Sequence, residues 1–482
     1  MGYYSDKYEA VIGLEVHAQL LTKSKLFCPD PIAFGAEPNT QISPISLAYP
    51  GTLPKLNEAA IELAVRLGLA CGCEIEDRNY FARKHYFYPD LPKGYQISQH
   101  TTPICKGGTV TIVTAAGERK VQLNRIHLEE DAGKSIHDLY DAYTAIDYNR
   151  AGTPLVEIVT EPDLHNGEEA AAYFTELRNL VRYLGVCDGN MEEGSLRCDA
   201  NISIRSIGSK ELGTKAEVKN LNSIRYVKKA IDFEVKRMIE LVDRGEKVKQ
   251  ETRGFNPDTE STFSIRTKED ANDYRYFTDP DLPAFVVTEA FKDSVKKSLP
   301  ELPAERKQRL VQQYTIHEKD AIRIAADNEW TRFFEASATL SNQYQQIVNW
   351  MMGPLKSYTN ETDLNIEATQ LTPQILVDLM LLVEKGSVSH SVATQKLFPL
   401  LVKEGGSPQL LATSLNLLQE RDEDMLSGLI DQVLNSMPGK VEEYQKGKKG
   451  LIGLFVGEVM KLSKGKADPK LLNQIIANKL QS

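Results

Sequence analysis

The sequence predicts an α+β protein in which a large sheet-based region precedes helical regions. Up to about residue 295, short runs of β-forming residues are bounded by Gly, Pro, Asn and Asp, whereas beyond it apolar residues recur at helical spacing. The 482 residues correspond to two to four domains, at roughly 100–200 residues per domain. No run approaches the ~18 uncharged apolar residues of a membrane-spanning helix, so we expect a globular protein.

Two breaks divide the chain. The segment LPELP at residues 299–303 precedes amphipathic segments near 304–314, 318–340 and 341–352, and KEGGSP at 403–408 precedes shorter helices. We therefore expect a sheet-based domain over 1–295, a helical domain over 296–405 and a helical tail over 406–482.

Charge and cysteine usage narrow the class of protein. The net charge of −10 argues against a surface coated for nucleic acid, although nine lysines against four acids from Pro438 onward leave a basic tail. Six scattered cysteines do not form a disulfide scaffold, and the first residues, MGYYSDKYEA, resemble no export signal. We expect a cytoplasmic protein with reduced thiols.

One helix stands out within the sheet-based region, over residues 166–184. Asn166 can cap it, Glu169 follows three residues later, and Gly185 ends it.

Several predicted strands alternate strictly between polar and apolar residues, so each carries two different faces. In the run 13–20, Glu15 and His17 project together, opposite Leu14 and Val16. The run 195–205 alternates throughout, and after a turn at 209–213 the run 215–219 follows as the second strand of a hairpin. The polar faces of these two strands should coincide.

Three further runs, 126–131, 155–161 and 191–193, add acidic residues. Strand parity places Glu129 and Glu130 on opposite faces, so one of them at most should contact a given ligand. If the strands form one antiparallel sheet, its concave side carries carboxylates, a histidine and interleaved Lys and Arg. Such a surface suits a divalent metal with a polyphosphate. The competing interpretation is a merely solvated sheet face.

The segment RKHYFYPD at 83–90 places charged and aromatic side chains beside a proline turn. It is compatible with phosphate or nucleic-acid binding, and equally with an aromatic loop that packs on a sheet.

Specific motifs recur along the whole chain. They are VIGLEVH at 11–17, FGAEPN at 34–39, KHYFYPD at 84–90, YQISQ at 95–99, HLEEDAGKS at 127–135, NRAGTPLVEIV at 149–159, MEEGSLRCDANIS at 191–203, the stretch 214–223, QETR at 250–253, DYRYF at 273–277, LFVGEVM at 454–460 and KGK at 464–466. In these motifs the chain resembles the B subunits of bacterial aspartyl/glutamyl-tRNA amidotransferases.

The resemblance implies a cradle domain on an antiparallel sheet, akin to glutamine synthetase and guanido kinases, followed by a helical domain and a helical tail. It implies a heterotrimer with a glutaminase A subunit and a small C subunit. With ATP and Mg²⁺, such a chain would phosphorylate the side-chain carboxylate of Glu or Asp misacylated on tRNA(Gln) or tRNA(Asn). Ammonia from the A subunit would then displace the phosphate.

Site residues follow from the matching motifs. The resemblance implies Glu15, His17 and Glu130 as the first metal-site candidates. The further metal candidates are Glu129, Glu157 and Glu193, the candidates for ATP or substrate contact are Lys84, Arg197 and Lys219, and the catalytic set is Glu15, His17, Lys84 and Glu130. Structural ion pairing is the alternative role for the three cations.

Many members of this family carry a four-cysteine zinc site. Cys28 is the one cysteine of that site that remains here, so no zinc is expected.

The tail lysines predicted to contact the tRNA backbone are Lys446, Lys448, Lys449, Lys461, Lys464 and Lys466.

Two other functions stay open at this point. One is a free-standing ATP-dependent amide ligase acting on a small acid, which would not need tRNA. The other is a non-catalytic tRNA-binding scaffold whose activity would survive loss of Glu15 or His17.

Overall fold

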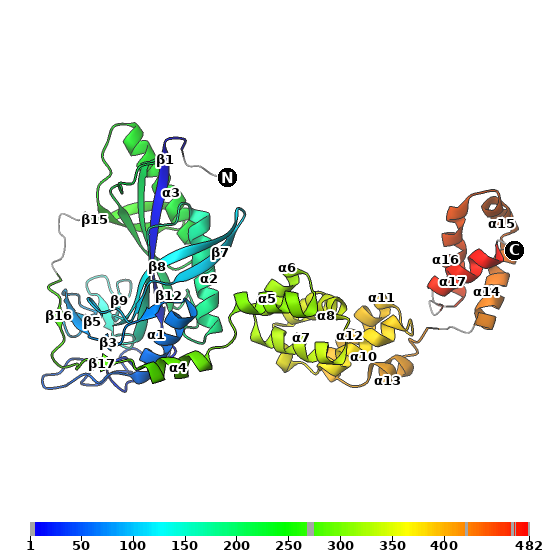
Figure 1. Cartoon of the computed structure of the whole chain (residues 1–482), viewed down its shortest axis with the longest axis horizontal. Coiled ribbons are helices and arrows are strands. Elements are labelled where there is room, and N and C mark those ends of the chain that lie inside the picture. The colour runs from blue at the N-terminus through cyan, green and yellow to red at the C-terminus, as the bar shows by residue number, and fades with distance from the viewer. Residues whose placement is uncertain (1–4, 268–273, 420–422, 464–466, 468, 481–482) are drawn as a thin grey trace. The chain divides into compact units, whose positions relative to one another are not determined.

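The structure is a computed structural model that describes residues 5–267, 274–419, 423–463, 467 and 469–480 (Figure 1). The chain divides into two compact units, Met1–Leu302 and Pro303–Ser482. The first combines a mostly antiparallel sheet with helices and the second is helical, which confirms the α+β class. Within the described ranges, every helix is too short or too polar to cross a lipid bilayer.

The strands of the described residues lie in the first unit. They are β1 (Tyr8–Gln19), β2 (Glu74–Ile75), β3 (Arg78–Asn79), β4 (Ala82–His85), β5 (Tyr95–Ser98), β6 (Cys105–Lys106), β7 (Thr109–Thr114), β8 (Gly117–Glu130), β9 (Lys134–Ile136), β10 (Ala145–Asp147), β11 (Pro154–Thr160), β12 (Leu196–Ser206), β13 (Ala216–Leu221), β14 (Glu251–Asn256), β15 (Ser261–Thr267), β16 (Phe277–Thr278) and β17 (Phe285–Val286).

The main sheet has the order β15-β14-β13-β12-β1-β11-β8-β5-β4-β16, with β2, β6 and β7 attached through β8. Neighbouring strands are antiparallel except β13 and β14, which are parallel. β1 lies in the middle, paired with β12 on one side and β11 on the other. The predicted hairpin between the runs 195–205 and 215–219 is confirmed as β12 and β13.

Among the described residues of the first unit, the helices are α1 (Glu58–Ala70), α2 (Gly167–Tyr183), α3 (Ile224–Asp243) and α4 (Glu289–Ser298). α1 contacts β8, α2 contacts β7 and α3 contacts β12. α2 confirms the predicted helix, because the Asn166 side chain accepts a hydrogen bond from the Glu169 backbone N–H.

The alternation predicted from the sequence is confirmed in the central strands. The apolar residues of β1 and β12, such as Leu14, Val16 and Ala200, are fully buried in the hydrophobic core of the first unit. Burying a whole side chain the size of Leu or Val stabilises the fold by about 1.5–3 kcal/mol. The polar residues of the same strands therefore share the other face.

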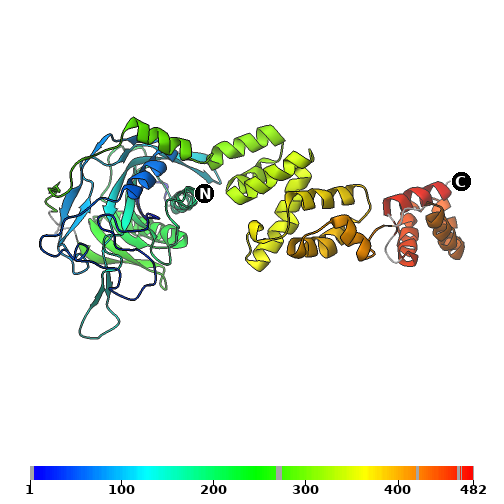
Figure 2. The ribbon, with the colours of Figure 1, turned by 90° about the horizontal axis from the view of Figure 1, so that it is seen from below.

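The second unit contains two groups of helices, which Figures 1 and 2 show in green to orange and in orange to red. The first group is α5 (Pro303–Tyr314), α6 (Glu318–Ala325), α7 (Asn328–Leu340), α8 (Tyr344–Trp350), η2 (Met351–Leu355), α9 (Lys356–Thr362), η3 (Ile366–Ala368), α10 (Pro373–Glu384), α11 (His390–Val392), η4 (Ala393–Leu397), α12 (Phe398–Glu404) and α13 (Pro408–Ser414). The second is α14 (Glu423–Ser436), α15 (Pro438–Gln445), η5 (Lys449–Leu451), α16 (Ile452–Leu462) and α17 (Pro469–Lys479).

Each helical group has its own hydrophobic core. The core of the first group includes Ala412, with Leu418 packed against it, and the core of the second group begins at Leu426. The boundary between the two hydrophobic cores therefore falls after Leu418, later in the chain than the break near residue 405 in the sequence. The predicted segment 318–340 is two helices, because the Asp327 side chain accepts hydrogen bonds from the backbone N–H groups of Glu329 and Trp330 and so starts α7.

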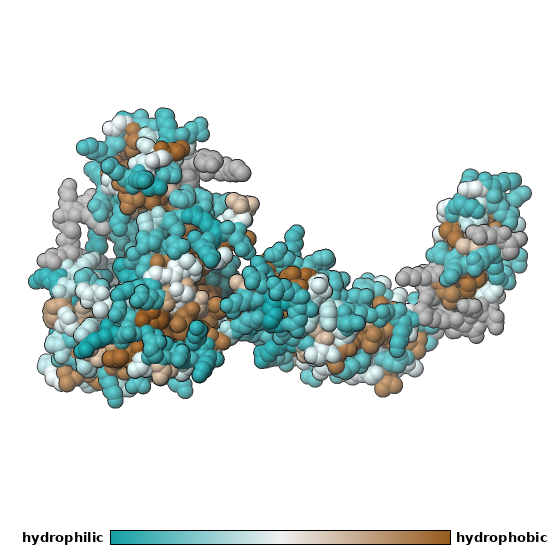
Figure 3. Space-filling model, viewed as in Figure 1, coloured by the Kyte–Doolittle hydropathy of each residue, from teal (hydrophilic) through white to brown (hydrophobic). Residues whose placement is uncertain are grey.

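Hydrophilic residues dominate the visible surface, with hydrophobic residues in small separate patches (Figure 3).

Candidate functional site

The polar face of the sheet gathers charged residues around β1. His17 lies opposite Glu157 of β11, and Glu15 lies opposite Asp199 of β12. Residues directly opposite one another in paired strands project to the same face, so the register alone brings these four side chains together.

His17, Glu129 and Glu157 form a first cluster. The Nε2 atom of His17 lies 3.7 Å from Glu129 Oε1 and 3.9 Å from Glu157 Oε2. These separations are too long for hydrogen bonds. They match two ligands of one cation, since ligand atoms about 2.0–2.2 Å from a metal lie roughly 3–4 Å apart.

His127 holds the two carboxylates of this cluster. Its Nε2 lies 3.0 Å from Glu157 Oε2 and 3.5 Å from Glu129 Oε2. Burial alone would lower the pKa of His127, but the carboxylates of Glu157 and Glu129 raise it to about 9. His127 is therefore a cation that orients both acids. The sequence signal for it was its position two residues before Glu129 on the same strand.

The donor chemistry of the first cluster also fits a divalent cation. Nε2 of His17 faces the carboxylates of Glu129 and Glu157, and carboxylate oxygens suit Mg²⁺ or Mn²⁺. The other ring nitrogen of His17, Nδ1, is buried and has no hydrogen-bond partner among the described residues.

Glu15, Asp199 and Glu217 form a second cluster, in which one oxygen of each lies within 4.8 Å of the others. Lys219 Nζ lies 3.0 Å from both Asp199 and Glu217, and the Asn201 side chain donates to Glu15 at 2.9 Å. Three carboxylates face one ammonium, so negative charge is left over. Burial and the neighbouring carboxylates, Glu157 first among them, raise the pKa of Glu15. A second cation would offset this charge.

Glu130 is not part of either cluster, in contrast to the expectation that it converges with Glu15 and His17. Its carboxylate lies 2.6 Å from Lys93 Nζ and accepts the Ile97 backbone N–H at 2.9 Å. The cause is strand parity, because Glu129 and Glu130 are consecutive residues of β8. Glu130 instead lines a cavity formed by both polar and apolar residues.

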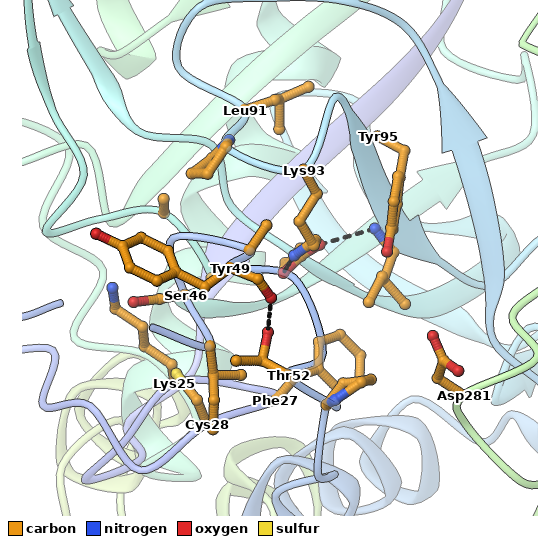
Figure 4. Close-up of a pocket in the computed structure, with 18 of the residues that line it drawn as sticks. Lys25, Phe27, Cys28, Ser46, Tyr49, Thr52, Leu91, Lys93, Tyr95 and Asp281 are labelled. Atoms are coloured by element: carbon orange, nitrogen blue, oxygen red, sulfur yellow. Dashed lines mark hydrogen bonds and ion pairs between the residues drawn. The ribbon is translucent and has the colours of Figure 1, made fainter. Parts of the chain in front are cut away.

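Figure 4 shows that cavity. Its labelled lining residues are Lys25, Phe27, Cys28, Ser46, Tyr49, Thr52, Leu91, Lys93, Tyr95 and Asp281.

The three predicted cations have different surroundings. Arg197 makes two hydrogen bonds to Asp131, at 2.9 and 3.0 Å, and Lys219 is paired within the second cluster. Lys84 forms no ion pair with any residue in the described part of the chain. Burial alone would lower the pKa of Lys84, but Glu129 in particular raises it. Lys84 therefore has its ammonium charge available to a ligand.

Glu193 stands apart from the two clusters. It is exposed in the turn before β12, where its backbone N–H donates to the Asn190 side chain at 3.2 Å. The resemblance suggested it as a ligand, whereas in the described part of the chain it belongs to neither group of acids that could hold a cation.

Four of the predicted tRNA-binding lysines lie among the described residues, and all four are exposed: Lys446 and Lys448 follow α15, Lys449 begins η5 and Lys461 lies in α16. Lys446, Lys448 and Lys461 pair with nearby glutamates at 3.5, 3.0 and 2.5 Å, and Lys449 lies over the Tyr444 ring at 4.3 Å. Lys464 and Lys466 lie outside the described residues. Exposed pairs of this kind are worth about 0–1 kcal/mol, so they do not prevent these lysines from contacting phosphate.

Fold and site together define an α+β protein with two groups of acidic residues on one sheet face, each of which could hold a cation. Comparison with known proteins shows the family. The model of the GatB/GatE catalytic domain matches residues 10–293, and that of the GatB domain matches residues 332–480.

Three similar proteins each carry the name of the B subunit of aspartyl/glutamyl-tRNA(Asn/Gln) amidotransferase. The protein from Thermodesulfovibrio yellowstonii is 47% identical over 470 residues, covering 98% of each chain. The proteins from Geotalea uraniireducens and Alkalilimnicola ehrlichii are each 47% identical to this chain. The first match covers 98% of this chain and 99% of the relative, and the second covers 99% of this chain and 100% of the relative. The chain belongs to the family of amidotransferase B subunits.

Proposed function

We propose that this chain is the ATP-dependent transamidating subunit of a tRNA-dependent amidotransferase. Its substrates would be Glu-tRNA(Gln), Asp-tRNA(Asn) or both, as the names of its relatives suggest. The observation that carries the proposal is the pair of acidic clusters on one sheet face, joined through β1.

The reaction needs an activated carboxyl group because a free carboxylate is a poor electrophile toward ammonia. A side-chain oxygen of the tRNA-bound Glu or Asp would attack the γ-phosphorus of ATP and release ADP. Ammonia would then displace phosphate and leave the amide. Both carboxylate and ATP are anionic, so the site must supply positive charge.

The residues that would hold Mg²⁺ are His17, Glu129 and Glu157 in the first cluster and Glu15, Asp199 and Glu217 in the second. Mg²⁺ bound there would offset the repulsion between the phosphates and the attacking carboxylate.

The chain's own cations would complete the site. Lys84 would bind the phosphate or the substrate carboxylate, since its charge is not taken up by an ion pair in the described residues. Arg197 and Lys219 would act indirectly, by holding Asp131 and Asp199 in place. Glu130 stays a catalytic candidate by resemblance, but its position beside Lys93 gives it no part in holding the cation.

The names of the relatives imply a complex of several subunits. We propose a cytoplasmic heterotrimer with a glutaminase A subunit and a small C subunit.

We also propose that the sheet-based domain resembles glutamine synthetase and guanido kinases, and that the chain binds no zinc. The chain would have three domains, and we place the second boundary after Leu418, where one hydrophobic core gives way to the next.

Reconstitution tests the proposal. The chain is combined with the two partner subunits, and ATP consumption and amide formation are followed with each misacylated tRNA. We expect ATP consumption to require tRNA carrying Glu or Asp and a divalent cation. ATP turnover with a small acid in place of tRNA would favour the free-standing ligase. Unchanged activity after Glu15→Ala or His17→Ala would favour the scaffold.

A further inference from the structure

The loop that follows β4 presents two aromatic side chains to solvent. The exposed fraction is 85% for Phe87 and 56% for Tyr88, although the neighbouring Tyr86 is partly buried. Scattered exposed hydrophobic residues are common. Two adjacent exposed rings beside a reactive site are a different matter, because flat aromatic surfaces are what unpaired bases stack on.

Lys84 connects this loop to the cation clusters. Its Nζ lies 5.7 Å from the centre of the Tyr86 ring and 5.0 Å from that of Tyr274, and its charge interacts with Glu129 and Glu157. Phe87 follows Lys84 by three positions, which is a chain length of roughly 10 Å. The exposed rings therefore lie close to Lys84, the cation proposed to bind the phosphate or the substrate carboxylate.

A series of packed aromatic rings holds the loop at Tyr86. The Tyr86 and Tyr274 rings meet edge to face at 5.9 Å, Tyr274 contacts Tyr276 at 6.1 Å, and Tyr276 stacks on His100 at 4.0 Å. Such contacts add to the stability of the aromatic cluster beyond the area they bury. A loop held in this way offers its outer rings as a fixed platform.

We propose that Phe87 and Tyr88 form a stacking platform for the unpaired 3′-terminal nucleotides of the aminoacylated tRNA. This inference rests on the proposed function, in which the amino acid esterified to that end must reach the clusters beside Lys84. The last nucleotides would then pass over the loop. Stacking would guide any tRNA end regardless of its sequence, and the lysine charge would meet the backbone.

The test uses the reconstituted heterotrimer carrying Phe87→Ala, Tyr88→Ala or both. Loss of one stacked base should raise the KM for Glu-tRNA by about 5- to 100-fold, with the KM for ATP and the glutaminase activity unchanged. Phe87→Tyr should restore the KM because it keeps a flat ring. Tyr140→Ala is the matched control, since Tyr140 is 59% exposed and lies elsewhere in the same unit.

A substrate lacking one base distinguishes stacking from other causes. A Glu-tRNA with an abasic ribose among its last unpaired positions should bind the wild type less tightly than intact Glu-tRNA does. The Phe87→Ala variant should bind the two tRNAs with nearly equal affinity, because it already lacks the stacking contact. An unchanged KM for Glu-tRNA in the double variant would refute the platform while leaving the proposed function intact. Failure of the variant to assemble with its partner subunits would assign the loop to a subunit interface and refute it too. Absence of tRNA-dependent ATP consumption in the wild type would overturn the proposed function itself.

Discussion

Glu129 and Glu130 are neighbours in β8, yet their carboxylates lie on opposite faces of the sheet. Glu129 lies 3.7 Å from His17, whereas Glu130 pairs with Lys93 at 2.6 Å. Both acids are buried away from water, so the negative charge of each must be stabilised by the groups that contact it on its own face.

Amide substitution of the two acids should therefore have different effects. Glu129→Gln removes a ligand of the first cluster and leaves the second intact, so Mg²⁺ should raise the melting temperature by less than it does in the wild type. Glu130→Gln leaves the ammonium of Lys93 without its partner, which should lower the free energy of unfolding by about 1–3 kcal/mol while the response to Mg²⁺ remains. Thermal unfolding with and without Mg²⁺ measures both effects. Equal responses of the two variants would contradict the assignment of the faces.

Lys84 should contribute through its charge. Lys84→Met should lower kcat/KM for tRNA-dependent ATP consumption by about 10²-fold or more, in the range seen when one charge-stabilising donor is removed. Lys84→Arg should recover part of the loss because the charge is kept. Steady-state kinetics of the reconstituted complex provide the comparison, and Lys23→Met, on an exposed side chain, serves as control. Equal activity of Lys84→Met and wild type would exclude Lys84 from the reaction.

The tail should act on tRNA and not on ATP. A chain ending after Leu418 keeps the core of the first helical group intact, because Ala412 and Leu418 remain. This truncation should raise the KM for Glu-tRNA far more than the KM for ATP, and the salt dependence of tRNA binding should become shallower. Kinetics at two or three salt concentrations would detect both changes. Equal effects on the two Michaelis constants would argue against tRNA binding by the tail.

The buried Lys25 in the cavity of Glu130 should make stability depend on pH. Burial lowers the pKa of Lys25 below its ordinary value of 10.5. Between the folded and unfolded pKa values, the unfolded chain binds more protons, so the stability of the wild type relative to Lys25→Met should increase with rising pH. The increase is about 1.4 kcal/mol for each pH unit of that window. Urea unfolding of both proteins at pH values of about 7.5 and 10 measures it, and a constant difference would contradict the effect.

Much of the fold could be predicted from local patterns. The strict alternation in β1 and β12 predicted the correct inward and outward residues, and Asn166 with Glu169 predicted the start of α2. The split between α6 and α7 at Asp327 could not be predicted in this way, because the apolar spacing continues across it.

The composition of the clusters could be predicted only in part. Strand parity predicted that Glu129 and Glu130 lie on opposite faces, but the sequence does not show which strands pair. Only the register of β8 with β11 shows that Glu129, and not Glu130, lies on the face of His17 and Glu157. Asp199 and Glu217 join Glu15 for the same reason. The pairing of Arg197 with Asp131 depends on the side chains of two residues 66 positions apart, which no local pattern encodes.

The most direct test of the two-cluster site is a count of bound Mn²⁺ by electron paramagnetic resonance, combined with tRNA-dependent ATP consumption, in the reconstituted complex. Glu157→Gln and Asp199→Asn each alter one cluster, and Glu161→Gln, just beyond the end of β11, is the matched control. We predict that each cluster variant loses a bound ion and nearly all ATP consumption, whereas the control keeps both. Full Mn²⁺ binding and normal ATP consumption in both cluster variants would contradict the account.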